Sequence, residues 1–213
     1  MSMTQTDTKT RILDCAERLF AREGYHATSL RTLTKEAEVN LASVNYHFGG
    51  KEALLQAVLE RHLLPLNAIR RDKINSVLEQ ARNRSTAPET EELLRAFVIP
   101  TFDFRDSAPG ARDFVTMIGR AMNEPDATVR NAFLILIIPL FKEFFAALRL
   151  ALPQLPPAVL LARLQYSMGA LSQALHTGKD DAAQHFDIPV TLNNQERINQ
   201  LLNFMQAGLE APL

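Results

Sequence analysis

The chain contains little that could cross-link it or anchor it in a membrane. One of its 213 residues is cysteine, so no disulfide can form within the chain, and we expect a reducing compartment. Its most apolar run, residues 132–141, is interrupted by Pro139 and followed by charged Lys142, whereas a membrane span needs about 20 apolar residues. The first ten residues are polar and lack the apolar centre of a signal peptide. These absences predict a cytoplasmic protein.

The sequence also lacks the residue patterns of common catalytic and metal sites. No phosphate-binding glycine loop or nucleophile elbow is present, and Cys15 lies among apolar helical positions, where a structural thiol is expected rather than a nucleophile. The histidines do not have the spacing of metal ligands; they are His26, His47, His62, His176 and His185. We therefore predict that the protein is not an enzyme and needs neither a metal nor a cofactor.

An excess of positive charge, which is common in nucleic-acid-binding proteins, is missing as well. The formal net charge is −1. Within residues 1–62 the basic side chains are Lys9, Arg11, Arg18, Arg22, Arg31, Lys35, Lys51 and Arg61, and the acidic ones are Asp7, Asp14, Glu17, Glu23, Glu36, Glu38, Glu52 and Glu60. The two sets are equal in number, so binding to DNA would have to depend on where individual side chains lie.

What is present is helical periodicity with clear stop signals. In the first predicted helix, Asp7 or Thr8 could cap the start, and Gly24 could end it in the left-handed conformation. Thr28 is the predicted N-cap of a second helix. The apolar residues expected to face inward on these two helices are Ile12, Leu13, Ala16, Leu19, Phe20, Leu30, Leu33 and Ala37.

A third helix is predicted over residues 41–47, with Asn40 as its N-cap. Gly49 and Gly50 should end it, and Lys51 should open a longer helix that Pro65 kinks or divides. The residues of the third helix expected to face inward are Leu41, Val44 and Phe48.

The rest of the chain also predicts helices and no strands, because alternating apolar and polar segments are absent. The expected ranges are 67–82, 89–104, 111–123, 126–151, 157–178 and 195–210. The predicted fold class is all-α. It comprises an N-terminal three-helix domain over 1–63 and a C-terminal helical domain over 64–213.

Two short helices joined by a tight turn have the geometry of a helix-turn-helix. The third helix presents short, hydrogen-bonding side chains outward, which suit base edges and phosphates; they are Ala42, Ser43, Asn45, Tyr46 and His47. Thr28 at a helix start and Lys51 at the next add groups that could bind phosphate.

These segments resemble the TetR family of regulators. The resemblance covers about residues 9–63 and lies in residues 16–20, 23–25, 28–29, 39–48 and 51–54. It implies an N-terminal helix-turn-helix DNA-binding domain over 1–63 and a C-terminal helical ligand-binding and dimerisation domain over 64–213. It also implies a homodimer that binds double-stranded, palindromic operator DNA, commonly as a repressor. It further implies that Thr28, Tyr46, His47 and Lys51 contact phosphates, and that Ala42, Ser43 and Asn45 read bases.

Two positions depart from the family pattern. Glu38 stands where the family usually has glycine, and a positive φ there would strain a glutamate by roughly 1 kcal/mol. Its acid could also weaken DNA affinity. Gly50 stands where the family usually has a Ser, Thr or Asn cap.

Eight phenylalanines lie between residues 97 and 145, together with methionines, which predicts a core and also an apolar effector pocket. The predicted pocket residues are Phe97, Phe102, Phe114, Met117, Arg120, Phe133, Phe141, Phe145 and Met168. Residues 39–48 and 152–157 are similar to fatty-acid-responsive family members, which implies a fatty acid or acyl-CoA whose head group meets Arg120 or Arg112. An aromatic or drug-like effector is the alternative.

Two late helices are predicted to form the dimer, although the same residues could instead form an intrachain core. These residues are Tyr166, Met168, Gly169, Ala170, Leu171, Leu201, Leu202, Phe204, Met205 and Leu209. A two-fold dimer would place paired recognition helices in successive major grooves, roughly 34–36 Å apart. A helical interaction protein that binds no DNA is the alternative from another class. Repressor and activator roles both remain open.

Overall fold

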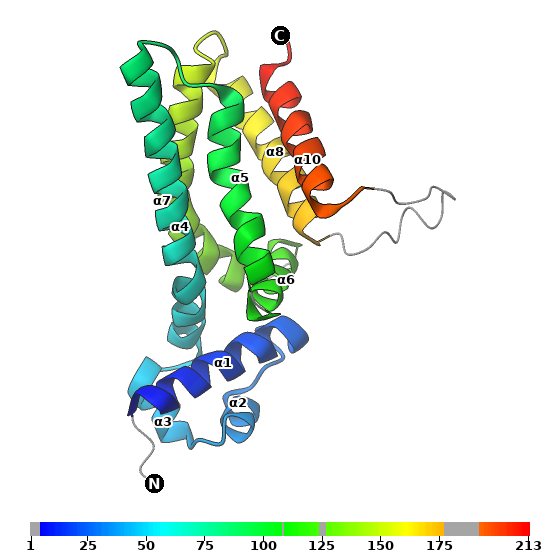
Figure 1. Ribbon diagram of the computed structural model, residues 1–213. Coiled ribbons are helices and arrows are strands. Elements are labelled where there is room, and N and C mark those ends of the chain that lie inside the picture. The colour runs from blue at the N-terminus through cyan, green and yellow to red at the C-terminus, as the bar shows by residue number, and fades with distance from the viewer. Residues whose placement is uncertain (1–4, 108, 124–126, 177–191) are drawn as a thin grey trace, which may run out of the picture. The chain divides into compact units, whose positions relative to one another are not determined.

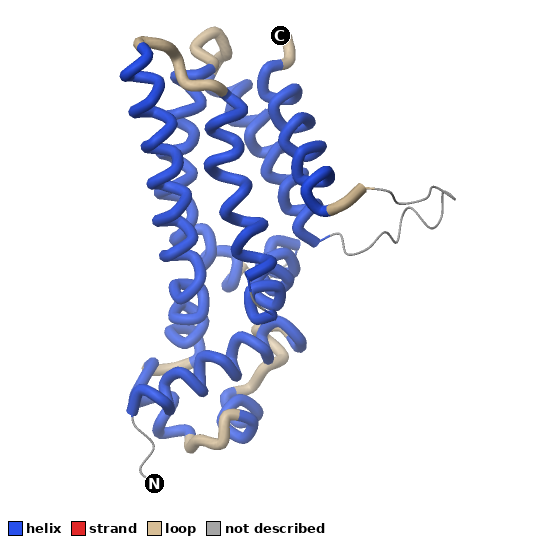
Figure 2. Tube along the Cα trace, viewed as in Figure 1, coloured by secondary structure: helices blue, strands red, loops and turns tan. Residues whose placement is uncertain are grey.

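The computed structural model describes residues 5–107, 109–123, 127–176 and 192–213. These residues form nine helices and no strand (Figure 2), which confirms the predicted all-α class. The helices are α1 (Gln5–Glu23), α2 (Leu30–Glu36), α3 (Leu41–Phe48), α4 (Lys51–Arg84), α5 (Thr90–Ser107), α6 (Pro109–Asn123), α7 (Thr128–Ala151), α8 (Pro157–His176) and α10 (Asn194–Glu210).

The chain divides into two compact units that each combine separate stretches of sequence. The first contains Met1–Pro65 and Asp106–Ile138, and the second contains Leu66–Arg105 and Pro139–Leu213. The sequence predicts a division by function, into a DNA-binding domain over 1–63 and a ligand-binding domain over 64–213. The division into compact units does not test it, and it stays a prediction.

The core of the first unit forms where α1 packs on α2, α3 and α6 (Figure 1). Leu19, Phe20 and Leu33 are almost completely buried there, and the rings of Phe20 and Tyr25 meet edge to face at 5.4 Å. The apolar positions of α1 repeat at the spacing of one helix face, and their burial against α2, α3 and α6 stabilises this unit.

The helix ends follow the sequence signals with two exceptions. Asn40 caps α3 as predicted, accepting a hydrogen bond from the Ser43 amide at 2.8 Å. Gly24, at φ 88°, lies in the left-handed region as expected. The predicted N-cap Thr28 is wrong, because the adjacent Ser29 accepts the hydrogen bond from the Thr32 amide. The predicted start of α1 is also wrong, since Asp7 and Thr8 lie inside the helix.

Pro65 does not divide the long helix, because α4 continues through it from Lys51 to Arg84. A proline inside a helix removes one backbone hydrogen bond and costs about 3 kcal/mol. Pro65 itself is exposed, whereas the flanking Leu63 and Leu66 are 3% and 5% exposed. Burial of apolar side chains on both sides of the proline therefore offsets the lost hydrogen bond.

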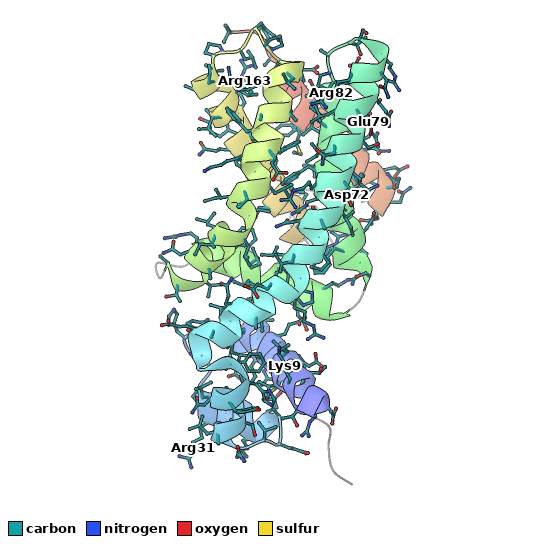
Figure 3. All side chains as sticks on the ribbon, turned by 90° about the vertical axis from the view of Figure 1, so that its left-hand side faces the viewer. Lys9, Arg31, Asp72, Glu79, Arg82 and Arg163 are labelled. Carbon is teal, nitrogen blue, oxygen red and sulfur yellow. The ribbon has the colours of Figure 1, made fainter. Side chains whose placement is uncertain are left out.

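The second unit is a helical layer in which α8 and α10 lie side by side (Figure 1). Phe97 of α5 stacks on Phe144 of α7 with ring centroids 4.6 Å apart. The Arg163 side chain of α8 (Figure 3) donates hydrogen bonds to the carbonyls of Leu209 and Pro212, both at 3.0 Å, which satisfies groups at the end of α10. Among the described helices, none is long and apolar enough to cross a membrane.

Candidate nucleic-acid interface

The turn between α2 and α3 is closed by the backbone. The amide of Val39 donates to the Thr34 carbonyl at 2.9 Å, and the amide of Glu38 donates to the Lys35 carbonyl at 3.3 Å. Leu33 and Val44, neither of which is exposed, face inward from the two helices. The burial of both side chains fixes which face of α3 is turned outward.

Glu38 has a φ of 52°, so the turn does adopt the left-handed conformation that a glycine would adopt without strain. The Arg11 side chain of α1 stabilises it. Its guanidinium donates to the carbonyls of Ala37 and Glu38, and lies 3.5 Å from the Glu38 carboxylate. A side chain from outside the motif therefore holds a turn that lacks glycine.

The outward face of α3 carries the residues that were predicted to meet DNA. Ala42, Asn45 and Tyr46 are exposed, Tyr46 by 73%. Ser43 and His47 are half-buried, and the Ser43 hydroxyl is 3.0 Å from the Asn40 side-chain oxygen. These five side chains form one polar surface along α3.

Leu41 does not face inward as predicted, since it is 50% exposed. It is the first residue of α3, and at a helix start the chain has not yet turned its inner face to the core. Val44, one turn later, fills that position. The exposed Leu41 adds an apolar group beside the polar surface of α3.

Thr28 cannot present its hydroxyl to a phosphate in this structure, because the residue is completely buried. The hydroxyl donates instead to the carbonyls of Gly24 at 2.8 Å and Leu19 at 3.3 Å. The Thr28–Ser29 pair offered two adjacent cap candidates, and the sequence pattern did not distinguish between them. Ser29, which is exposed, stands at the start of α2 in its place.

Lys51, at the start of α4, lies against the loop that precedes α2. Its ammonium nitrogen is 4.3 Å from the centroid of the Tyr25 ring and 3.5 Å from the His26 carbonyl. Partial burial lowers the pKa of Lys51 below its usual value. The ring and the carbonyl hold the cation against Tyr25 and His26, in the loop that precedes α2.

The charges of the N-terminal helices are unevenly paired. Four arginines hold five acids in the pairs Arg11–Glu38, Arg18–Glu36, Arg22–Glu23, Arg22–Glu36, Arg61–Asp14 and Arg61–Glu17. Among the residues that the structure describes, Lys9, Arg31, Lys35 and Lys51 have no carboxylate within 4.0 Å (Lys9 and Arg31 are labelled in Figure 3). A charge sum of zero therefore leaves four cations available to phosphates.

A second group of contacts joins α1, α4 and α6 within the same unit. The His62 ring lies 2.7 Å from the buried Glu17 carboxylate and 4.7 Å, centroid to centroid, from the Phe114 ring. Gly110 of α6 passes so close that an added Cβ would lie 2.8 Å from a Glu17 oxygen. Sequence reasoning missed this group, because its members are distant in the chain.

The predicted pocket residues are distributed over four helices and both units. Phe114, Met117 and Phe133 belong to the first unit, and the Arg120 side chain lies outside the described residues. Those of the second unit are Phe97, Phe102, Phe141, Phe145 and Met168. Arg112, the other predicted head-group contact, is exposed and lies 3.5 Å from Asp106. The pocket itself stays a prediction.

Sequence reasoning also missed Arg70, which is 5% exposed in the interior of the second unit. Its guanidinium donates to Asn67 Oδ1 at 3.1 Å, to Thr101 Oγ1 at 2.6 Å and to the Phe97 carbonyl at 3.3 Å. Burial lowers its pKa to about 10. A signal was available, because Arg70 continues the helical stripe of the buried Leu63, Leu66 and Ile74.

Comparison with known sequence families gives two matches. The family described as bacterial regulatory proteins, tetR family, matches residues 12–58. The family described as the tetracyclin repressor-like C-terminal domain matches residues 95–208, which is more than half of the chain.

Individual relatives are similar over shorter stretches. The probable transcriptional regulator YttP of Bacillus subtilis is 27% identical over 101 residues, which is 47% of this chain and 45% of YttP. The transcriptional regulator UidR of Escherichia coli K12 is 36% identical over 52 residues, which is 24% of this chain and 26% of UidR. The chain thus spans less than half the length of these curated relatives.

A solved structure extends the similarity to the whole fold. The fatty acid degradation regulator FadR from Bacillus halodurans superimposes with a TM-score of 0.68, covering 99% of both chains at 14% sequence identity. At this identity the likeness establishes a shared fold.

The left-handed turn predicts how variants of Glu38 will differ in stability. Glu38→Asn and Glu38→Gln both remove the carboxylate, but asparagine tolerates positive φ better than glutamine. We expect Glu38→Asn to be more stable than Glu38→Gln by about 0.5–1 kcal/mol in urea unfolding. Equal stability of the two variants would mean that the turn is not strained.

Proposed function

Because the chain belongs to the TetR family of bacterial regulatory proteins, we propose that it is a transcriptional repressor which binds a palindromic operator as a homodimer and releases it when a hydrophobic effector binds. The observation that carries this proposal is the helix-turn-helix of α2 and α3, with its polar outer face beside cations that have no described acidic partner. Such a regulator would act in the cytoplasm, where chromosomal DNA is reached directly.

The proposed DNA contacts follow from exposure and chemistry. Ala42, Ser43 and Asn45 read base edges, because short side chains let α3 enter the major groove. Tyr46, His47 and Lys51 contact phosphates from the two sides of that helix. The four cations that have no acidic partner among the described residues add long-range attraction to the DNA backbone. Thr28 is replaced in this set by the exposed Ser29.

Substitutions at the interface test these contacts, with duplex DNA selected from a random library by the protein itself. We expect Tyr46→Ala to weaken binding about tenfold, and Lys51→Gln to weaken it similarly while reducing the salt slope by about 1. Fluorescence anisotropy over a range of salt concentrations measures both quantities. Lys73→Gln, at an exposed site on α4 outside the helix-turn-helix, is the matched control and should change neither. Unchanged affinity for both interface variants would contradict the contact set.

The effector is proposed to be a fatty acid or an acyl-CoA. The predicted pocket residues are apolar apart from Arg120, and those with described side chains are buried or half-buried. FadR from Bacillus halodurans, which shares the fold, is a regulator of fatty acid degradation, and that function supports a lipid effector here. An aromatic or drug-like effector is the competing outcome.

The contacts of Phe114 suggest how effector binding reaches the DNA-binding helices. Phe114, a predicted pocket residue, touches His62, and His62 in turn binds Glu17 of α1. An effector that displaces Phe114 would loosen the Glu17–His62 contact and so favour a second arrangement of α1 and α6. Release of DNA then follows from a difference in effector affinity between the two arrangements.

Titration of the protein–DNA complex with palmitate and with palmitoyl-CoA tests the effector class. At fixed salt, we expect micromolar lipid to lower the anisotropy of labelled DNA to that of the free duplex, because the lipid stabilises the form that binds DNA weakly. Gly110→Ala, which pushes against Glu17, should alter the lipid concentration needed for release. Tight DNA binding that neither lipid disturbs would reject the lipid and favour the aromatic class.

The homodimer is proposed to form through α8 and α10, using the side chains that the chain itself leaves uncovered. Tyr166 and Phe204 are 75% and 67% exposed, and exposed Gly169 would let a second helix approach closely. Five of the other residues predicted for the dimer interface are buried within the chain, as expected if they form an intrachain core. They are Leu171, Leu201, Leu202, Met205 and Leu209.

A charge placed on this face should separate the subunits. We expect Phe204→Glu and Tyr166→Glu each to give monomers at micromolar concentration, because a buried unpaired carboxylate costs several kcal/mol. Light scattering coupled to size exclusion measures the mass. Leu150→Glu, at a 56% exposed apolar position on α7, is the control and should stay dimeric. Intact dimers in both test variants would place the interface elsewhere.

A further inference from the structure

Arg70 is buried without a described counter-ion, unlike the other buried charge in the described part of the chain. Glu17, the other charged side chain buried to this degree, lies within 4.0 Å of His62 and Arg61. Arg70 has no described carboxylate at that distance. Its surroundings are the Phe97 ring, 4.6 Å from the guanidinium carbon, and neutral oxygen atoms.

The hydrogen bonds of Arg70 leave part of its guanidinium unused. An arginine has five N–H groups, and the described acceptors account for one on each of its three nitrogens. One N–H on each terminal nitrogen is left over. Each of these two groups can donate a charge-assisted hydrogen bond to a carboxylate oxygen, and a pKa of about 10 keeps the cation charged at neutral pH.

We propose that Arg70 binds the carboxylate of the effector, so that the effector is an apolar monocarboxylic acid rather than a thioester. This inference rests on the proposed function and narrows it. A buried cation without a counter-ion is unfavourable in an apolar interior, and an incoming carboxylate would remove that penalty. The adjoining Phe97 and Phe144 rings are buried and stacked on each other, so the guanidinium lies in apolar surroundings.

The chemistry at Arg70 argues against acyl-CoA as the preferred ligand. A thioester carbonyl is uncharged, so it would leave the buried cation unneutralised. The phosphates of CoA are charged, but bringing them to a residue that is 5% exposed would bury several negative charges against one positive charge. A compact carboxylate matches the charge of Arg70 one to one.

Arg70 also contacts both helices that would have to respond to a ligand in the second unit. It belongs to α4, and its hydrogen bonds reach Thr101 and the Phe97 carbonyl of α5. A carboxylate bound to the remaining N–H groups would lie where these hydrogen bonds join α4 to α5. Arg112 is a weaker candidate for the same role, because it is exposed and close to Asp106.

The test compares acids with their neutral counterparts. Binding of laurate, myristate and palmitate, and of the alcohols of equal chain length, is measured by calorimetry below their micelle concentrations. We expect the wild-type protein to bind the best acid about tenfold more tightly than its alcohol or better, because the charge-assisted hydrogen bonds exist only for the acid. Arg70→Met should bring this ratio to about one while the alcohol still binds. Arg70→Lys should keep part of it.

Arg71→Met is the matched control, because Arg71 is the next residue on α4, is partly exposed and pairs with Glu143 at 2.8 Å. Its acid-to-alcohol ratio should equal that of the wild type. The proposal is overturned if the wild type does not distinguish acid from alcohol, if Arg70→Met keeps the preference, or if no acid binds. Should Arg70→Met not fold, the wild-type ratio and Arg70→Lys decide the question. DNA binding is measured on the same preparations, so that failure of the two proposals can be distinguished. Loss of DNA binding counts against the proposed regulator. DNA binding that is kept without acid binding counts against the role of Arg70 alone.

Discussion

The Glu17 carboxylate is taken out of water inside the first unit, where the His62 ring and Arg61 hold it. A buried carboxylate without these partners would cost several kcal/mol, so α1 and α4 are constrained to stay where the partners are. A Cβ added at Gly110 of α6 would lie 2.8 Å from an oxygen of the same carboxylate, so a side chain there would have to displace it. The position of α1, on which α2 and α3 pack, therefore depends on one buried charge.

Pairing of charges also explains how a chain with almost no net charge can bind a polyanion. Four arginines on the N-terminal helices pair with five of the eight acids of residues 1–62, while the lysines and Arg31 stay without described acidic partners. Because the bidentate guanidinium suits carboxylates, this division leaves ammonium groups, which act as point charges, available to phosphates. The electrostatic field at α3 depends on this arrangement more than on the sum of charges.

Much of the fold could be predicted from local signals, and the failures have identifiable causes. Helix positions followed from apolar periodicity, and the Asn40 cap and the left-handed Gly24 followed from side-chain chemistry. Thr28 and Ser29 offered equivalent caps, and only the packing of Thr28 under α1 decided between them. Arg70 was missed because its charge suggested exposure although its helical position indicated burial, and Glu17 and His62 are joined only by the fold.

Cys15 is the single cysteine of the chain, 1% exposed, with its thiol 3.6 Å from the Leu33 carbonyl. Burial, followed by the nearby Glu36 charge, raises its pKa, and since the thiolate is the nucleophile, this sulfur is protected from alkylating reagents. We therefore expect little background reactivity of the native protein toward maleimides. A cysteine introduced on the solvent side of α3 or α8 would then be the main site that a maleimide fluorophore labels. Fluorescence from that known position could follow movements of the labelled helix.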